Sequence, residues 1–258
     1  MSRLALTFEC GADRLAGTLD TAPGHTGLLI VSGGSEIRSG AFGGQARLAA
    51  EVARAGFPVF RFDRRGVGDS EGEDRGFRKS RKDIAAALLA FRAIAPQVDR
   101  VAGFGNCDAA SALMLAGGAG CDALVLSNPW TIEADESDAP PPAAVRARYA
   151  EKLRNPKEIA RLLRGGVNLR KLAGGMLRAS TSGSPRSDLA EHMRAGVGSF
   201  VGPVAILLAG RDRTAQVFAD RWPQGDTRVM RCADADHAFS TPDARDWLRA
   251  RVLEALGD

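Results

Sequence analysis

One cysteine in this sequence occupies the position of a catalytic nucleophile. Residues 101–111 read Val-Ala-Gly-Phe-Gly-Asn-Cys-Asp-Ala-Ala-Ser, which predicts a buried strand, a sharp turn and a helix of small residues. The run resembles Gly-x-Ser-x-Gly, in which serine is the nucleophile, but Cys107 replaces the serine and Ala109 the second glycine. The helix N-terminus behind the thiol would favour negative charge there. We therefore interpret Cys107 as a nucleophile.

A cysteine nucleophile needs a base, and the base needs a carboxylate to orient it. Asp212 and His237 each follow a predicted strand, and His237 is the last of the three histidines in the chain. The order of nucleophile, acid and histidine is the one found after strand-to-helix nucleophile turns. Asp234 and Asp236 could compete as the orienting acid, but they lie too close in sequence to His237. We predict a triad of Cys107, His237 and Asp212.

Asp108 is a rival nucleophile at the same turn. That assignment would place Asn106 and Ala110 at the two positions that require small residues, and it would lose Gly105. We rank it below Cys107. We expect Asp108 to cap the following helix with its side chain and to donate its backbone N–H to an oxyanion.

The second oxyanion donor should come from residues 32–40, Ser-Gly-Gly-Ser-Glu-Ile-Arg-Ser-Gly, which follow an apolar strand. Glycines there would let backbone N–H groups approach a developing negative charge. Gly34 is the first candidate and Ser35 the second. The loop does not fit the nucleotide-binding pattern Gly-x-Gly-x-x-Gly. We therefore expect no nucleotide, and residues 63–70 should act structurally, by locking a loop at the edge of the site.

The chain alternates short apolar runs with helical runs, which predicts an α/β fold: a mainly parallel eight-stranded sheet with helices on both faces. Ligands of such sheets bind at the carboxyl ends of the strands. The alternation stops between residues 129 and 202, so we expect residues 1–128 and 203–258 to form the core and residues 129–202 a helical lid. The predicted strands cover residues 4–8, 15–19, 27–32, 57–62, 101–105, 123–127, 203–209 and 227–232, and the predicted helices cover 42–54, 80–94 and 242–256.

Composition excludes several functional classes. The 258 residues are 45% hydrophobic and 26% charged with a net charge of +4, and no Lys/Arg block indicates nucleic-acid binding. The N-terminus lacks a signal-peptide core, and no run is long enough to span a membrane. The four cysteines have no metal-ligand spacing, so we expect neither metal nor cofactor. Because no export signal is seen, we expect reduced thiols and a cytoplasmic location. The expected partner is a small ester or thioester.

Taken with these residues, the sequence resembles the α/β-hydrolase superfamily, in its serine-aminopeptidase or monoglyceride-lipase-like branch. More narrowly, it resembles the exosortase A system-associated hydrolase 1 family of exopolysaccharide-producing bacteria. The segments that carry the resemblance span nearly the whole chain: Gly33-Gly34 with Arg38-Ser39-Gly40, residues 63–72, residues 105–111, Asn128-Pro129-Trp130, Asp212-Arg213-Thr214-Ala215 and residues 236–240.

The resemblance implies acyl chemistry of the hydrolase type. We expect hydrolysis of carboxylic esters or thioesters through a thioacyl-enzyme. The alternatives are an acyltransferase in exopolysaccharide production and a binding protein without turnover. The sequence departs from the pattern at Ala109, and at Ser32, where many relatives have histidine before the oxyanion glycine.

Overall fold

An eight-stranded sheet lies at the centre of the computed structural model, which describes residues 2–132 and 188–257. Its strand order is β1-β2-β4-β3-β5-β6-β7-β8. β1 pairs antiparallel with β2, and β2 with β4, whereas the pairs from β4 to β8 are parallel. The strands are β1 (Arg3–Cys10), β2 (Asp13–Asp20), β3 (Thr26–Val31), β4 (Val59–Phe62), β5 (Arg100–Asn106), β6 (Ala123–Ser127), β7 (Val204–Ala209) and β8 (Val229–Cys232).

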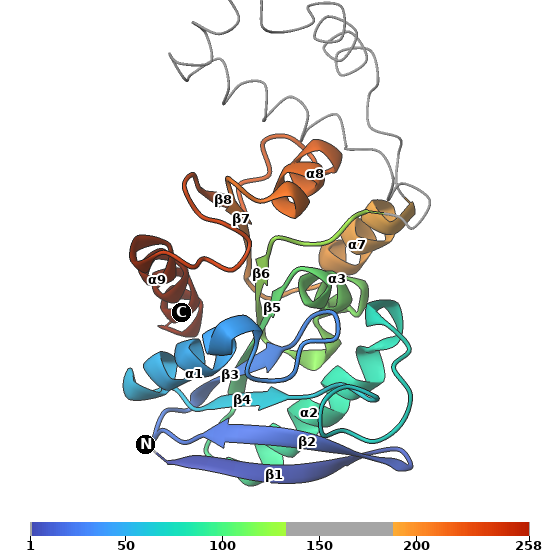
Figure 1. Cartoon of the computed structure of the whole chain (residues 1–258), viewed down its shortest axis with the longest axis vertical. Coiled ribbons are helices and arrows are strands. Elements are labelled where there is room, and N and C mark those ends of the chain that lie inside the picture. The colour runs from blue at the N-terminus through green and yellow to red at the C-terminus, as the bar shows by residue number, and fades with distance from the viewer. Residues whose placement is uncertain (1, 133–187, 258) are drawn as a thin grey trace, which may run out of the picture.

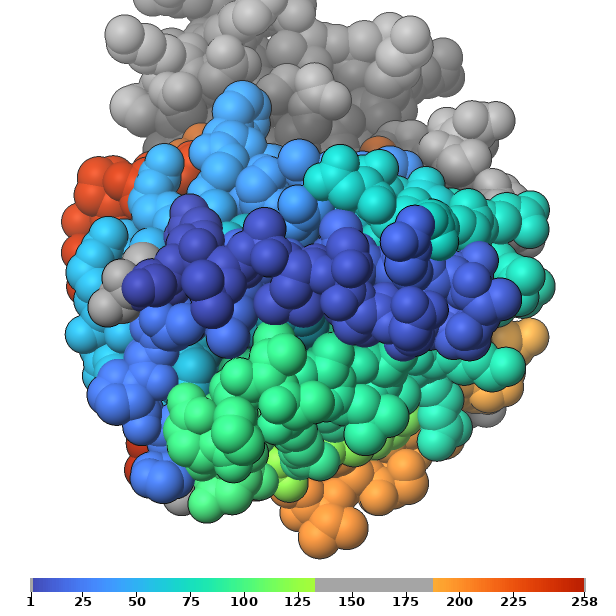
Figure 2. Space-filling view, turned by 90° about the horizontal axis from the view of Figure 1, so that it is seen from below, coloured from blue at the N-terminus to red at the C-terminus, as the bar shows by residue number. Residues whose placement is uncertain are grey.

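Helices cover both faces of this sheet. In Figure 1, α1 and α9 lie on one side, and α2, α3 and α7 lie on the other. The helices are α1 (Gly44–Arg54), α2 (Arg81–Ile94), α3 (Asp108–Leu115), α7 (Asp188–Gly198), α8 (Arg213–Arg221) and α9 (Pro242–Gly257), with short 3₁₀ turns at η1 (Ala41–Gly43), η2 (Phe77–Lys79) and η3 (Gly117–Gly120). Figure 2 shows β1 as an exposed band beside α2.

Two apolar cores follow from the alternation of side chains along the central strands. On β5, Val101 faces the core under α2, α3, α7 and α8, whereas Ala102 and Phe104 face the core under α1 and α9. The central strands are apolar on both faces, as expected for parallel strands covered on both sides. Each large side chain that is fully buried in this way stabilises the folded state by about 1.5–3 kcal/mol. The sheet is thus a rigid support for the loops at its carboxyl edge.

The predicted fold class is confirmed, with every predicted strand present and the predicted order of elements intact. Most of the expected lid, residues 133–187, lies outside the described residues. The C-terminal part of the expected lid forms α7, which packs against α3 and buries Leu189, Met193 and Val197 in the core under α2, α3, α7 and α8. That helix therefore belongs to the core. Across the described residues, no helix is long and apolar enough to span a bilayer.

Candidate active site

Cys107 lies at a strained turn between β5 and α3. Its backbone has φ 60° and ψ −126°, a conformation that residues other than glycine rarely adopt. Such a conformation costs about 1–3 kcal/mol and persists only where neighbours enforce it. Here the Cys107 N–H donates to the Ser127 carbonyl at 2.9 Å, and the Cys107 carbonyl accepts from the Trp130 N–H at 3.3 Å. The turn places Cys107, which is partly exposed, directly after β5 at the carboxyl edge of the sheet.

The small residues around this turn let α3 start immediately behind β5. A Cβ atom at Gly105 would lie 2.7 Å from backbone atoms of both Ala109 and Ala110. Ala109 is fully buried at the position where the serine pattern has its second glycine. Gly105 is therefore required by the close approach of helix and strand. Alanine is tolerated at position 109 because its side chain packs into the core.

The structure brings the three residues of the predicted triad together. His237 Nδ1 lies 3.0 Å from Asp212 Oδ2, with the Asp212 side chain 8% exposed and the His237 side chain 42% exposed. Asp212 is also the N-cap of α8, where its carboxylate accepts from the Ala215 N–H at 2.9 Å. Hydrogen bonds with Asp212 first, and with Cys107 second, raise the pKa of His237 to about 10.

The competing carboxylates near His237 have other roles. Asp236 accepts two hydrogen bonds from Ser240, one from the Ser240 N–H at 2.8 Å and one from the Ser240 hydroxyl. These bonds lower the pKa of Asp236. Asp234 is exposed. Among the described residues, Asp212 is therefore the carboxylate that pairs with the imidazole.

Two asparagines that the sequence analysis gave no role fix the loop of His237. The buried Asn128 donates from Nδ2 to the His237 carbonyl at 3.2 Å and to Asn106 Oδ1 at 3.1 Å, and its Oδ1 accepts from the Ala209 N–H at 2.8 Å. Asn106 also donates to the His237 carbonyl at 3.3 Å. The ends of β5, β6 and β7 are thereby tied to the histidine loop. The segment Asn128-Pro129-Trp130 carries part of the sequence resemblance, but a linear pattern does not show which backbone groups the Asn128 amide contacts.

Asp108 does not cap α3 with its side chain, so that expectation was wrong. The helix has no side-chain cap, and Asp108 Oδ1 instead accepts the Gly34 N–H at 2.6 Å. A Cβ atom at Gly33 would lie 2.5 Å from the same Oδ1, so the loop must be glycine there to approach the carboxylate. The Gly34 N–H, expected as an oxyanion donor, is therefore engaged. The N–H groups of Ser35 and Asp108 have no acceptor among the described residues.

The buried Arg64 side chain lies next to both Gly34 and Asp108. The Arg64 guanidinium donates to the Gly34 carbonyl and, at 3.0 Å, to Ser80 Oγ, and it lies 3.9 Å from Asp108 Oδ2. Arg64 is 3% exposed. A buried charge pair of this kind adds little net stability, because the cost of removing both charges from water offsets their attraction.

The turn that follows β4 also holds the loop after β3. Asp63, which is fully buried, accepts the Arg38 N–H at 2.5 Å and bonds the Arg38 guanidinium. The expected structural role of residues 63–70 agrees with these contacts.

The described part of the chain contains no cluster of three or more His, Cys, Asp or Glu side chains suited to a metal ion. The four cysteines are free, with Cys10 and Cys121 buried and Cys107 and Cys232 partly exposed. Burial raises the pKa of Cys121 to about 12. A thiol-directed reagent should therefore discriminate strongly among these cysteines.

Several solved structures share this fold. An esterase of Pyrococcus furiosus, Pf2001, is 15% identical with a TM-score of 0.62, over 99% of this chain and 90% of its own. Est1E of Butyrivibrio proteoclasticus, solved with bound ferulic acid, is 15% identical with a TM-score of 0.61, over 98% and 100%. XC6422 of Xanthomonas campestris, described as a serine hydrolase without a lid, is 17% identical with a TM-score of 0.59, over 100% and 97%. At these identities the likeness concerns the fold alone.

A comparison with curated proteins gives no match. The model of the alpha/beta hydrolase family matches residues 28–251, which include the Cys107 turn, Asp212 and His237. Because this match covers most of the sequence, the chain belongs to the alpha/beta hydrolase family.

Proposed function

We propose that the protein hydrolyses carboxylic esters or thioesters, with Cys107 as nucleophile, His237 as acid and base, and Asp212 as the residue that orients the imidazole. The observation that carries the proposal is the 3.0 Å contact between His237 and Asp212 beside a cysteine held at φ 60°. Alpha/beta hydrolases commonly have serine at this turn. A thiol there supports the same acyl chemistry, since a thiolate paired with an imidazolium is a strong nucleophile.

The reaction would proceed in two balanced steps. The Cys107 thiolate attacks the carbonyl carbon, and the tetrahedral intermediate then expels the leaving oxygen or sulfur, which takes a proton from the His237 imidazolium. In the second step, neutral His237 accepts a proton from water while the oxygen of that water attacks the thioester carbonyl. Collapse of this second intermediate releases the carboxylic acid and restores the thiolate and the imidazolium.

The oxyanion would be held by backbone N–H groups at the start of α3 and in the loop after β3. The free N–H groups of Asp108 and Ser35 are the first candidates. Gly34 could contribute only if the Asp108 carboxylate released its N–H, because the two are 2.6 Å apart. Such donors typically contribute about 2.7–4 kcal/mol each to the transition state.

The test is an acyl-chain series of p-nitrophenyl esters and of matched thioesters, with the wild type, Cys107→Ser, Cys107→Ala and the control Cys232→Ala. We expect both substitutions at Cys107 to abolish or greatly reduce turnover, and Cys232→Ala to retain it. Full activity in Cys107→Ala would refute the assignment.

Two further measurements separate the proposal from its alternatives. Rapid labelling of Cys107 by iodoacetamide, with slow labelling of the buried Cys121 and of the partly exposed Cys232, favours catalysis over a binding role. The ratio of acid to transferred product in the presence of alcohols, amines or sugars separates hydrolysis from acyl transfer. A role beside an exosortase system rests on the sequence resemblance, and an excess of acyl-sugar product would direct the proposal to exopolysaccharide acylation.

A further inference from the structure

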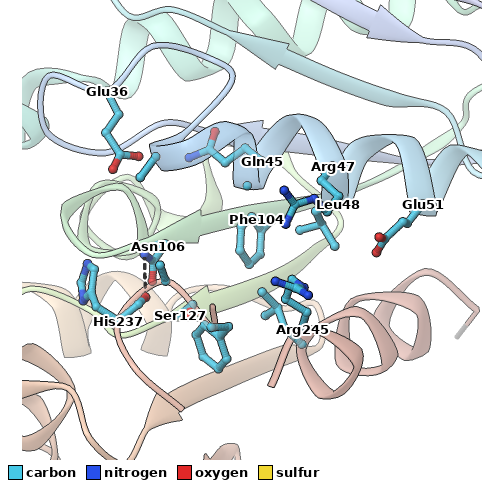
Figure 3. A pocket seen from close by; sticks show the side chains of 15 residues that line it. Glu36, Gln45, Arg47, Leu48, Glu51, Phe104, Asn106, Ser127, His237 and Arg245 are labelled. Atoms are coloured by element: carbon cyan, nitrogen blue, oxygen red, sulfur yellow. Dashed lines mark hydrogen bonds between the residues drawn. The ribbon is translucent and has the colours of Figure 1, made fainter. Parts of the chain in front are cut away.

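A cavity of about 110 Å³ opens beside His237, between the N-terminal halves of α1 and α9. Its floor is formed by Phe104 and Asn106 at the end of β5, and its apolar walls include Leu48 and Leu248. Figure 3 shows His237 and Asn106 at one end of the cavity, with Phe104 between that end and the two arginines Arg47 and Arg245. The cavity thus has a reactive end, an apolar middle and a cationic end.

The position of the cavity assigns it to one half of the substrate, and this step rests on the proposed function. The cavity is lined by His237, whereas Cys107 and Gly34 do not contribute to its wall. During acylation the imidazolium donates its proton to the departing oxygen or sulfur, so the leaving group must lie against the histidine. The space that His237 borders is therefore on the leaving-group side of the carbonyl.

The charges at the far end favour an anion. Arg47 is exposed and forms no ion pair with any described residue, and Arg245 donates a hydrogen bond to the Ser240 carbonyl at 2.6 Å. Two carboxylates also line the cavity. Glu51 lies 3.7 Å from Arg249, which offsets its charge, and Glu36 lies at the His237 end.

We propose that this cavity binds the leaving group of the substrate, and that the leaving group is an alcohol or thiol with an apolar stem and a terminal carboxylate. The hydroxyl or thiol end would lie at His237, the stem would cross Phe104, and the carboxylate would meet Arg47 and Arg245. The planar donor fork of a guanidinium matches the two oxygens of a carboxylate, which makes arginine well suited to this role.

The substrate test uses three thioesters that share an acetyl group and differ at the far end of the thiol: S-acetyl-6-mercaptohexanoate, its primary amide and S-acetylhexanethiol. Each is assayed with the wild type, Arg47→Gln and the control Arg54→Gln, which lies exposed on the same helix outside the cavity. We expect Arg47→Gln to lower kcat/KM about tenfold for the carboxylate substrate alone, as loss of a charge-assisted bond would do. A fall of equal size for all three thioesters, or no fall, would overturn the inference.

A binding measurement separates this inference from the proposed function. Calorimetric titration of Cys107→Ala with 6-hydroxyhexanoate should give saturable binding that Arg47→Gln weakens in the same background, while 1-hexanol binds both forms equally. If this holds but no thioester is cleaved, the cavity assignment stands and the proposed hydrolysis fails. If all three thioesters are cleaved equally well and 6-hydroxyhexanoate does not bind, the hydrolysis stands and the cavity assignment is wrong.

Discussion

The N–H group of Gly34 donates a 2.6 Å hydrogen bond to the carboxylate of Asp108, the residue directly after the proposed nucleophile. The bond joins the loop after β3 to the start of α3. The Arg64 guanidinium lies near both partners, the Gly34 carbonyl and the Asp108 carboxylate. It also places a negative side chain beside the region where the tetrahedral intermediate would develop negative charge. The bond positions the loop, and in the proposed reaction the Asp108 carboxylate would oppose the negative charge of the intermediate.

The first prediction concerns that opposing charge. Asp108→Asn keeps an oxygen that can accept the Gly34 N–H and removes the negative charge. A like charge near a developing oxyanion opposes it by about 1 kcal/mol in a partly exposed site, so we expect kcat for p-nitrophenyl acetate to rise roughly three- to tenfold. Stopped-flow measurement of the acylation phase checks this. A lower rate in a variant of unchanged stability would show that the carboxylate assists the reaction.

The second prediction follows from the raised pKa of His237, about 10, whose largest cause is the hydrogen bond with Asp212. The imidazolium therefore persists through neutral pH and is lost as the pH rises through about 10. Its pairing stabilises the fold fully below the ordinary pKa near 6.5 and no longer does so above the raised value. We expect Asp212→Asn to lower the pKa of His237 and to move the alkaline limb of kcat/KM to lower pH.

Proton NMR of the imidazole signals measures this shift directly, because the chain has three histidines. His25 and His192 serve as internal controls, since among the described residues the histidine paired with Asp212 is His237. An unaltered His237 titration in Asp212→Asn would contradict the role given to the carboxylate.

The meeting of Cys107, His237 and Asp212 could be predicted because parallel strands bring their carboxyl ends to one edge. Each residue follows a strand that the sequence marks clearly, so the order of elements was enough to place all three at one edge. The contact between Asp108 and Gly34 could not be predicted in the same way. Both a side-chain cap and a reach to the opposite loop suit an aspartate at a helix start, and only the path of the glycine loop decides between them.

The asparagine network was likewise beyond the sequence. Asn128 adopts φ 43° at the end of β6, where its amide meets groups from β7 and from the histidine loop. Those partners lie about 80 to 110 residues away in the chain. Their approach depends on strand register, which a local pattern leaves open.

The third prediction tests this network. Asn128→Asp retains the oxygen that accepts the Ala209 N–H but replaces the Nδ2 donor with an oxygen facing the His237 carbonyl. Unpaired or repelling buried polar groups cost about 1–3 kcal/mol, and displacement of the loop should lower kcat/KM about tenfold. Urea unfolding and steady-state kinetics measure the two effects. Asn128→Gly, which tolerates the positive φ and adds no repulsion, should lose less of both; equal losses in the two variants would contradict the expected repulsion.

The fourth prediction concerns the glycine that lets α3 begin behind β5. In Gly105→Ala the new methyl group would lie 2.7 Å from backbone atoms of Ala109 and Ala110, which cannot move without shifting the helix. Overpacking of this kind costs about 1–3 kcal/mol, so the urea midpoint should fall. The matched control is Gly198→Ala, because a Cβ atom there meets nothing within 4 Å. Since the shift would also move Cys107, iodoacetamide labelling of its thiol should change in Gly105→Ala and not in the control. Equal urea midpoints and equal labelling rates in the two variants would mean that α3 can move away from β5 without disturbing the turn at Cys107.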